Sequence, residues 1–422
     1  MMSEETSETQ APPMSVLSRI IHMVGPGLVT ACVVIGPGSI LTSSSVGASS
    51  GYSKAWVIVV AVLFMMTYTT MAARLGAVTQ TSTAELISRY AGRWLAVIVG
   101  LGVFFISAAF QFGNNLGVHT AIHAYVPFDY WVIVLNAMAI AFVFGFKNLY
   151  DMLEKAMACF VGLMLVSFAL NLWFAKPNLS ELAAGLVPSA GDGTIGLPLL
   201  GLVGTTFVIS AAYYQSYLVR FRGWTSRDLR AGLIDSRVSA FIMFLITLMI
   251  MSTSAAVLRG QELTSVGDIA SQLEPLFGEK GRAIFLIGLF SAAFSSFIVN
   301  SMIGGFILAD ALGLGSTPKE RAPRVLTVAV LLSGMVVALY VIRTGSRPDK
   351  AIIAAQAVTV IAAPLMAFVL LWLTNKPSVM GEFRNGPLIN LFGGVGFVLL
   401  LLMAWYTAST KVWPAIQQAT NG

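Results

Sequence analysis

The sequence has little charge. Asp, Glu, Lys and Arg together make up 10% of its 422 residues, whereas 57% of the residues are hydrophobic. An average soluble domain carries about 25% charged residues, so this chain lacks the charge that would cover its surface in water. Its mean hydropathy is +0.82. The composition excludes an ordinary soluble domain and predicts an integral membrane protein.

Cysteines and the usual catalytic motifs are also scarce. The two cysteines, Cys32 and Cys159, lie in apolar runs, which leaves no disulfide framework and no CxxC metal site. The chain has no HExxH sequence, no nucleotide-binding loop and no Ser-His-Asp order. The net charge of +6 comes from Lys and Arg scattered through short loops. We therefore expect neither an enzyme nor a nucleic-acid-binding protein, and we expect no cofactor and no obligate protein partner.

Long apolar segments are what the chain has in abundance. A helix needs about 20 mostly apolar residues to cross the bilayer, and the alternation of an outer-membrane barrel is absent. Eleven segments meet the helix rule, near 27–50, 55–78, 94–117, 130–147, 152–174, 197–219, 233–257, 283–309, 325–342, 351–374 and 388–409. The expected fold is therefore all-α, with about eleven transmembrane helices. Loop 258–282 has the spacing of one short amphipathic surface helix.

The expected organisation is a pair of inverted repeats of five spans. Residues 1–20 are polar and acidic and predict a disordered cytoplasmic tail. Residues 21–180 then hold the first repeat, 181–375 hold the second, and 376–422 hold the eleventh span and the carboxyl terminus. With the amino terminus inside, sixteen Lys and Arg face the cytoplasm and nine face outward. This asymmetry predicts a multi-pass protein of the cell membrane with a cytoplasmic amino terminus and an outer carboxyl terminus.

The first span contains a sequence that should interrupt a helix. Residues 33–51 read VVIGPGSILTSSSVGASSG, with Gly36, Pro37 and Gly38 in succession. Proline inside a helix costs about 3 kcal/mol and each glycine adds about 1 kcal/mol relative to alanine. Such a break is tolerated in a membrane only where the freed backbone faces protein or water. A plain proline kink is the simpler alternative.

A second weak segment lies five spans later. Residues 204–217 read GTTFVISAAYYQSY, which is small and hydroxyl-rich where the rest of the chain is Leu and Val. Because it has no proline, the sequence argues less strongly for a break here. Paired interrupted helices at corresponding positions of two halves indicate the central site of a transporter. Spans 1 and 6 correspond if the chain has the LeuT-type inverted 5+5 repeat.

Three stretches resemble the natural-resistance-associated macrophage protein (Nramp) family of divalent-metal transporters. Residues 25–56 contain GPGLVTACVVIGPGSI, followed by GASSGY and a Trp, and are similar to the first span of that family. ARLGAVTQTSTAELISRY (73–90) is similar to its RLG-xx-TG-xxLAE stretch, and FSSFIVNSMIGGFILADALG (294–313) to its eighth span. The resemblance extends over all eleven spans and implies a carrier whose partners are a divalent cation and the lipid bilayer.

The positions that hold the metal in the family differ here. The Asp and Asn of the family's DPGN sequence fall on Gly36 and Ser39, and the metal-binding Met of span 6 falls on Val208. The resemblance implies that the carbonyl of Thr205 and the span 10 amide of Gln356 remain as ligands. If the span 6 register shifts, Ala211 or Ala212 takes the place of Val208. A serine at position 39 that only satisfies its own helix is the simpler alternative.

The titratable residues of the family are also replaced. Its span 3 acids fall on Gln111 and Asn114, its span 6 histidines fall on Ser210 and Gln215, and a span 9 Arg falls on Val328. We expect the four polar residues to line the cavity. Gln111 and Asn114 lie three apart on a helix and share a face, and a purely structural bond between helices is an equal alternative for them.

The replacements favour a hard cation. Met is a soft ligand suited to transition metals, whereas Mg²⁺ prefers oxygen and keeps several of its waters. The sequence therefore resembles the prokaryotic Nramp-related magnesium transporters. We expect uptake of partly hydrated Mg²⁺, with Mn²⁺ as a second cargo. Loss of the titratable groups predicts uncoupled alternating access without proton co-transport.

Other functions stay open. One is a proton-coupled Mn²⁺ or transition-metal transporter of the Nramp type, and another is a LeuT-fold carrier of amino acids or organic solutes. Asp235 and Asp310 are expected to form interfacial salt bridges. His119 and His123 have a spacing that could hold a transition metal, but the sequence offers no nearby carboxylate or cysteine.

Overall fold

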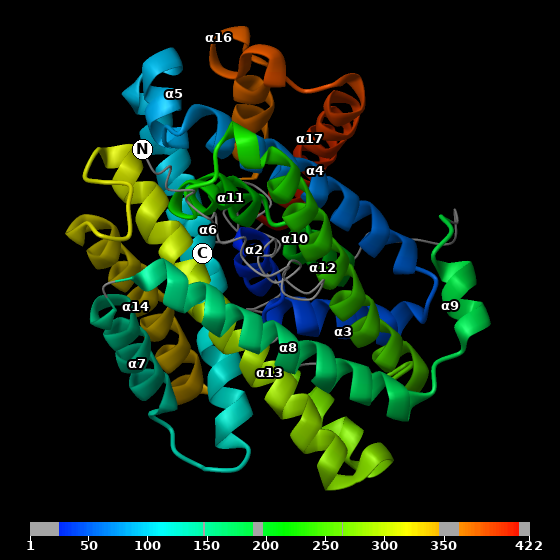
Figure 1. Cartoon of the computed structure of the whole chain (residues 1–422). Coiled ribbons are helices and arrows are strands. Elements are labelled where there is room, and N and C mark those ends of the chain that lie inside the picture. Colours follow the sequence, from blue (N-terminus) through cyan, green and yellow to red (C-terminus); the bar gives the residue numbers. More distant parts are fainter. Residues whose placement is uncertain (1–24, 147, 189–196, 264, 346–362, 413–422) are drawn as a thin grey trace, which may run out of the picture.

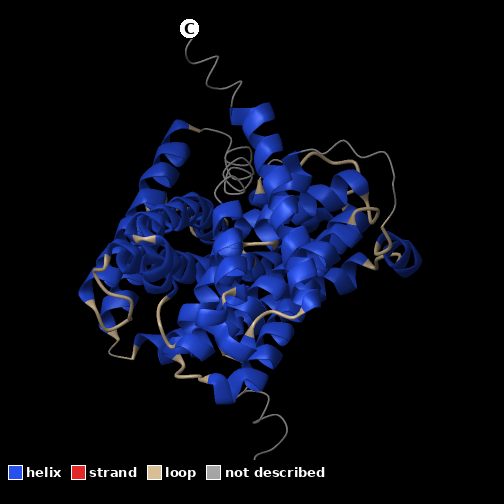
Figure 2. Cartoon of the chain, turned by 90° about the horizontal axis from the view of Figure 1, so that it is seen from above, coloured by secondary structure: helices blue, strands red, loops and turns tan. Residues whose placement is uncertain are grey.

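The computed structural model describes residues 25–146, 148–188, 197–263, 265–345 and 363–412. The described residues form helices joined by short loops and contain no strand (Figures 1 and 2). The helices of the first half are α2 (Pro26–Val34), α3 (Pro37–Ser50), α4 (Ala55–Thr79), α5 (Thr83–Ala91), α6 (Arg93–His123), α7 (Trp131–Gly145), α8 (Leu149–Ala175) and α9 (Leu179–Gly185).

The second half has the same all-helical character. Its helices are α10 (Leu197–Thr206), α11 (Ile209–Phe221), α12 (Leu229–Val257), α13 (Val266–Leu312), α14 (Arg321–Thr344), the helix Ala363–Asn375, α16 (Pro377–Met380) and α17 (Pro387–Thr407). The short turns are η1 (Ser226–Asp228), η2 (Gly381–Phe383) and η3 (Ala408–Val412).

The predicted spans agree with these helices. Each of the eleven segments coincides with a helix or a helix pair, except that residues 351–362 of the tenth segment lie outside the described residues, as do residues 1–20. In the described part of the chain, seven helices are long and apolar enough to cross a membrane, and α2 with α3 makes a further span bent by 57°.

The amphipathic segment after the seventh span forms a helix, as its spacing predicted. It begins at Val266, is capped by Ser265, whose Oγ accepts from the Asp268 amide at 3.0 Å, and continues into the eighth span as α13. The joint is a kink at Gly278, where φ is +71°. Glycine adopts this left-handed conformation without steric cost. The surface segment and the eighth span therefore follow one another without an intervening loop.

The interrupted helices lie in the middle of the molecule. Figure 1 shows α2 and α10 surrounded by α4, α6, α8, α12 and α13. Eight of the nine residues of α2 are buried. The unwound backbone that follows α2 and the one that follows α10 are thus surrounded by protein rather than by lipid, as a break at membrane depth requires.

Small residues allow the central helices to approach closely. Gly117 of α6 faces Pro37 at the start of α3: a Cβ at position 117 would lie 2.7 Å from Pro37 Cβ and 3.1 Å from Ala293 Cβ. Gly76 of α4 likewise faces the backbone of Ser216 on α11. Small residues at helix interfaces are the usual means of close packing in membranes. Gly117 therefore fixes where the second half of the first span begins.

Gly117→Ala is expected to destabilise the protein, because the new methyl group overlaps the Pro37 ring. Overpacking of this kind costs about 1–3 kcal/mol, and we expect a lower midpoint of thermal unfolding in detergent. Gly162→Ala on α8 is the matched control, since nothing lies within 4 Å of a Cβ there. An equal or higher midpoint for Gly117→Ala would contradict the proposed packing.

Candidate functional site

The first span breaks at Ile35 and Gly36. The last bond of α2 runs from the Ile35 amide to the Ala31 carbonyl (3.1 Å), and α3 begins with the Ile40 amide donating to the Gly36 carbonyl (3.0 Å). Gly36 is extended and Pro37 occupies the first helical position, where its missing N–H costs nothing. The Gly-Pro-Gly sequence therefore makes a true interruption rather than a plain kink.

The sixth span breaks at Phe207 and Val208. The Phe207 amide donates to the Val203 carbonyl at 2.7 Å, and Val208 is extended before α11 begins. The Val208 carbonyl then accepts from the amides of Ala211 and Ala212, both at 3.1 Å. Although no proline is present, the break lies within the hydroxyl-rich segment that the sequence singled out.

A direct hydrogen bond joins the two interrupted spans. Thr42 Oγ1 on α3 lies 3.1 Å from Thr205 Oγ1 on α10, and both residues are completely buried. Thr205 is the penultimate residue of its helix. The second half of the first span is thus fixed to the first half of the sixth.

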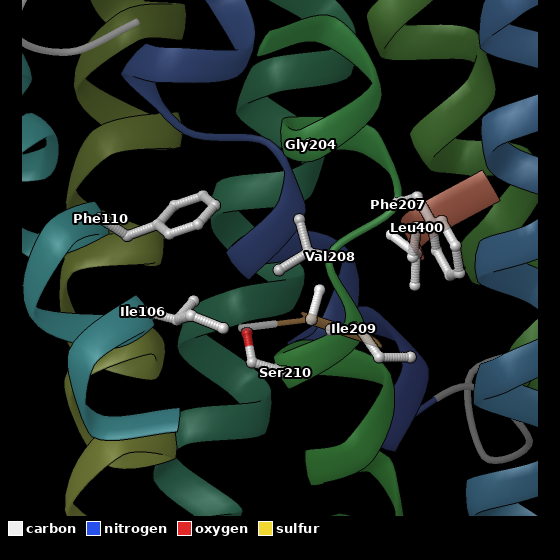
Figure 3. A pocket seen from close by; sticks show the side chains of 9 residues that line it. Ile106, Phe110, Gly204, Phe207, Val208, Ile209, Ser210 and Leu400 are labelled. Carbon is white, nitrogen blue, oxygen red and sulfur yellow. The ribbon is translucent and has the colours of Figure 1, made fainter. Parts of the chain in front are cut away.

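A cavity lies beside the second break. Val208 and Ser210 face Ile106 and Phe110 of α6 across it (Figure 3). Its lining residues in the described part of the chain are Ile106, Phe110, Gly204, Phe207, Val208, Ile209, Ser210, Ala363 and Leu400. The space that water can enter is about 10 Å³, close to the minimum for a single water molecule. In this conformation the cavity is therefore too small for a hydrated ion, and most of its lining side chains are apolar.

Amides and hydroxyls gather on the α6 and α13 side of the first break. A Cβ at Gly36 would lie 3.1 Å from Asn114 Oδ1 and 3.2 Å from Ser296 Oγ. Gln111 Oε1 accepts from Asn114 Nδ2 (3.5 Å) and from Asn300 Nδ2 (3.3 Å). We call Gln111, Asn114, Ser296 and Asn300 the amide–hydroxyl cluster. All four are at most 2% exposed, so the cluster brings neutral polar atoms to the first break.

Several polar atoms near the breaks have no protein partner. Ser39 Oγ, Ser210 Oγ and Gln111 Nε2 are buried and form no hydrogen bond with the described residues. Burying a hydroxyl or amide without a partner costs about 1–3 kcal/mol. Hydroxyl oxygens held in this way are suited to contact a hydrated ion through its water or directly.

The other candidate residues are placed as follows. Gln215 faces away from the cavity lining, toward Thr30 of α2: Thr30 Oγ1 donates to Gln215 Oε1 at 2.5 Å. Ala211 and Ala212 are buried on the first turn of α11 and do not line the cavity. Gln356 lies outside the described residues.

Two carboxylates have roles that the sequence did not show. Asp235 is not at an interface: it is completely buried and accepts hydrogen bonds from the amides of Gly25 (2.9 Å) and Gly27 (2.7 Å). Asp310 accepts from Ser82 Oγ (2.9 Å) and Tyr217 OH (2.5 Å). Neither Asp235 nor Asp310 forms an ion pair within 4.0 Å among the described residues. The prediction that they form interfacial salt bridges is therefore wrong.

The sequence analysis did not predict that Ser296 would lie beside the first break. Its Oγ donates to the Val33 carbonyl at 3.3 Å. A signal was present, because Ser296 and Asn300 are four apart and share one face of a helix. The sequence could not tell which helix that face meets.

The histidine pair does have a carboxylate beside it. His119 and His123 have ring centroids 4.8 Å apart, and Asp129 Oδ1 lies 3.4 Å from His123 Nε2. Even so, the described residues contain no group of three His, Cys, Asp or Glu side chains arranged to hold a metal.

The fold is shared with solved metal transporters. The crystal structure of the Eremococcus coleocola manganese transporter, solved with an aromatic bis-isothiourea compound, is similar with a TM-score of 0.82 and 19% sequence identity, covering 96% of this chain and 90% of that one. Together with the two breaks, this likeness confirms the LeuT-type inverted repeat with interrupted first and sixth helices.

Sequence relatives cover nearly the whole chain. The divalent metal cation transporter MntH of Deinococcus radiodurans is 26% identical over 403 residues, which is 92% of this chain and 89% of that protein. The metal transporter Nramp3.1 of Populus trichocarpa is 27% identical over 424 residues, or 96% of this chain and 84% of that protein. Residues 27–410 match the family model described as natural resistance-associated macrophage protein-like. Since that match runs from the first span to the last, the chain belongs to the Nramp family of multi-pass membrane proteins.

Proposed function

We propose that this protein carries divalent cations across the cell membrane and binds the ion between its two helix breaks. Family membership supports cation transport, and the Thr42–Thr205 bond supports a shared site because it holds the two interrupted spans together at the level of the breaks. Interrupted helices supply carbonyl oxygens and helix ends for ions in carriers of this architecture. Residues 21–180 and 181–375 are then the two repeats that move against each other.

We further propose Mg²⁺ as the chief cargo. The observation that carries this proposal is the neutral character of the first break, where the atoms nearest to a Cβ at Gly36 belong to Asn114 and Ser296. The proposed ligands are the carbonyls of Gly36, Thr205 and Val208 and the side chains of Ser39 and Gln356. Hard oxygen donors suit Mg²⁺, which keeps part of its hydration shell. A partly hydrated ion needs a state with a wider cavity than the present one.

We propose that transport is uncoupled from protons. The positions that carry acids and histidines in the family hold Gln111, Asn114, Ser210 and Gln215 here, and amides and hydroxyls do not titrate near neutral pH. The inward-negative membrane potential lowers the free energy of moving a positive charge into the cell by about 2.3 kcal/mol per charge per 100 mV. For a divalent cation this term alone favours uptake.

The second candidate is a proton-coupled Mn²⁺ carrier. Two observations favour it: the relatives named above are described as transporters of manganese, of divalent metal cations or of metal, and none of them is named for magnesium. In addition, Asp235 places a buried carboxylate at the start of α2, where a proton could bind. A carrier of amino acids or other organic solutes remains the third possibility for this architecture.

Proteoliposomes distinguish these candidates. With a Mg²⁺-sensitive dye inside and an inside-negative potential, we expect saturable Mg²⁺ influx without acidification of the interior. Mn²⁺ influx accompanied by acidification, with no Mg²⁺ influx, would establish the second candidate, and saturable amino-acid uptake the third. Empty liposomes under the same potential give the background.

Restoring the family's ligands is expected to change selectivity. Gly36→Asp combined with Ser39→Asn and Val208→Met adds a carboxylate and a thioether, which favour a transition metal over Mg²⁺. We expect the ratio of Mn²⁺ to Mg²⁺ influx to rise by at least about tenfold, or about 1.4 kcal/mol. An unchanged ratio in a folded variant would remove these positions from the site. Ser49→Asn, at an exposed position of the same helix, is the control.

Ser39→Ala tests the single hydroxyl at the first break. Losing one neutral donor of this kind costs about 0.5–1.5 kcal/mol, so we expect the Mg²⁺ concentration at half-maximal influx to rise roughly threefold to tenfold. Ser49→Ala is the control, because Ser49 Oγ bonds only within its own helix end and to Ser50. Equal kinetics for both variants would mean that Ser39 only satisfies its helix.

A further inference from the structure

The start of α2 is held by one carboxylate on another helix. Asp235 of α12 accepts from the Gly25 amide through Oδ1 and from the Gly27 amide through Oδ2. The first amides of a helix have no partner within it, and a negative charge at this end interacts favourably with the helix dipole. Asp235 therefore acts as a distant cap of α2. It lies 210 positions after Gly25 and 208 positions after Gly27 in the sequence.

The bonding continues into the second interrupted span. Gln215 Nε2 on α11 donates to Asp235 Oδ2 at 3.3 Å, while Gln215 Oε1 accepts from Thr30 of α2. One connected group of side chains thus joins α2, α11 and α12. The amides that Asp235 binds are at the opposite end of α2 from the break at Gly36, and none of these residues is among the proposed ion ligands.

Glycine permits this close contact. A Cβ at Gly27 would overlap Ser239 Oγ and lie 2.9 Å from the Asp235 carbonyl oxygen, and a Cβ at Gly25 would lie 2.5 Å from Glu154 Oε1. Glu154 is paired with Arg222 beside Gly25. Burial lowers the pKa of Arg222, but the hydrogen bond to Glu154 outweighs burial, and the pKa of Arg222 lies above its ordinary value. The Arg222 guanidinium therefore stays charged.

We infer that Asp235 is a positioning residue that clasps α2 against α11 and α12 and so closes the path to the break from this end. This inference rests on the proposed transport function. The helix α2 is nine residues long and is separated from α3 by the extended Gly36, a joint that lets it turn as one body. An ion can pass on this side only when α2 moves, and that movement breaks both bonds to the Asp235 carboxylate.

Cys32 is a built-in reporter of this movement. It lies on α2, is completely buried, and its Sγ lies 3.6 Å from the Met157 carbonyl. The chain has two cysteines, so Cys159→Ser leaves Cys32 as the single thiol. In that background, the rate at which N-ethylmaleimide labels Cys32 measures how often α2 opens to water.

Asp235→Asn is expected to raise the labelling rate of Cys32 at least about tenfold. The asparagine side chain has no charge, and it has one acceptor oxygen where the carboxylate has two. Asp310→Asn is the control: it removes a partly buried carboxylate that bonds to Ser82 and Tyr217 rather than to α2. We expect its labelling rate to stay within about twofold of the parent protein. Labelling is done with a chelator and no divalent cation, so the result does not depend on which ion is carried.

Two results would overturn the inference. One is an unchanged rate in folded Asp235→Asn protein, and the other is an equal rise in Asp310→Asn, which would indicate general loosening. The midpoint of thermal unfolding is measured on each variant for this purpose. If Asp235→Asn does not fold, Thr30→Val decides: it removes the hydroxyl that bonds to Gln215 and to the Pro26 carbonyl and leaves Asp235 in place. A rise of about threefold supports the clasp, and no rise refutes it. If Asp235→Asn raises the labelling rate but the proteoliposomes show no cation influx, the proposed function is refuted and the inference about Asp235 stands.

Discussion

Backbone hydrogen bonding in lipid is the constraint on which the rest of this structure depends. Unpaired N–H and C=O groups cannot be left in hydrocarbon, so the two interruptions at Gly36 and Val208 must be enclosed by other helices. The chain meets this requirement by burying α2, α10 and α11 in its middle and by using small residues such as Gly117 where helices approach the breaks. The surrounding helices α4, α6, α8, α12 and α13 are long and apolar.

The polar groups brought to the breaks determine the chemistry that is possible there. The amide–hydroxyl cluster, Ser39 and Ser210 supply neutral donors and acceptors, whereas the carboxylates of Asp235 and Asp310 are bonded elsewhere, to helix amides and to hydroxyls. Relatives in the family are described as carriers of manganese and of divalent metals. The difference between this neutral set and a transition-metal site is what makes Mg²⁺ the proposed cargo.

Much of the fold could be predicted because the spans are long and apolar, and because Gly-Pro-Gly cannot continue a helix. The second break was predicted less strongly, from the small and hydroxyl-rich composition of residues 204–217 and from their position five spans after the first break. The role of Asp235 could not be predicted, because a carboxylate near a basic loop has the same local sequence whether it faces water or a distant helix end. The amphipathic helix before the eighth span was predicted from its spacing, but the joint at Gly278 was not, because glycine permits a kink as readily as a loop.

The hydroxyl pair that joins the interrupted spans has no fixed direction. When Thr205 donates to the Leu202 carbonyl (3.2 Å), Thr42 can donate to Thr205; when Thr42 donates to the Gly38 carbonyl (2.9 Å), Thr205 can donate to Thr42. Each oxygen can therefore turn its lone pairs outward while the contact persists. A cation beside one of the two oxygens would favour the direction in which that hydroxyl donates to the other. The donor and the acceptor can therefore exchange roles while the two spans stay joined.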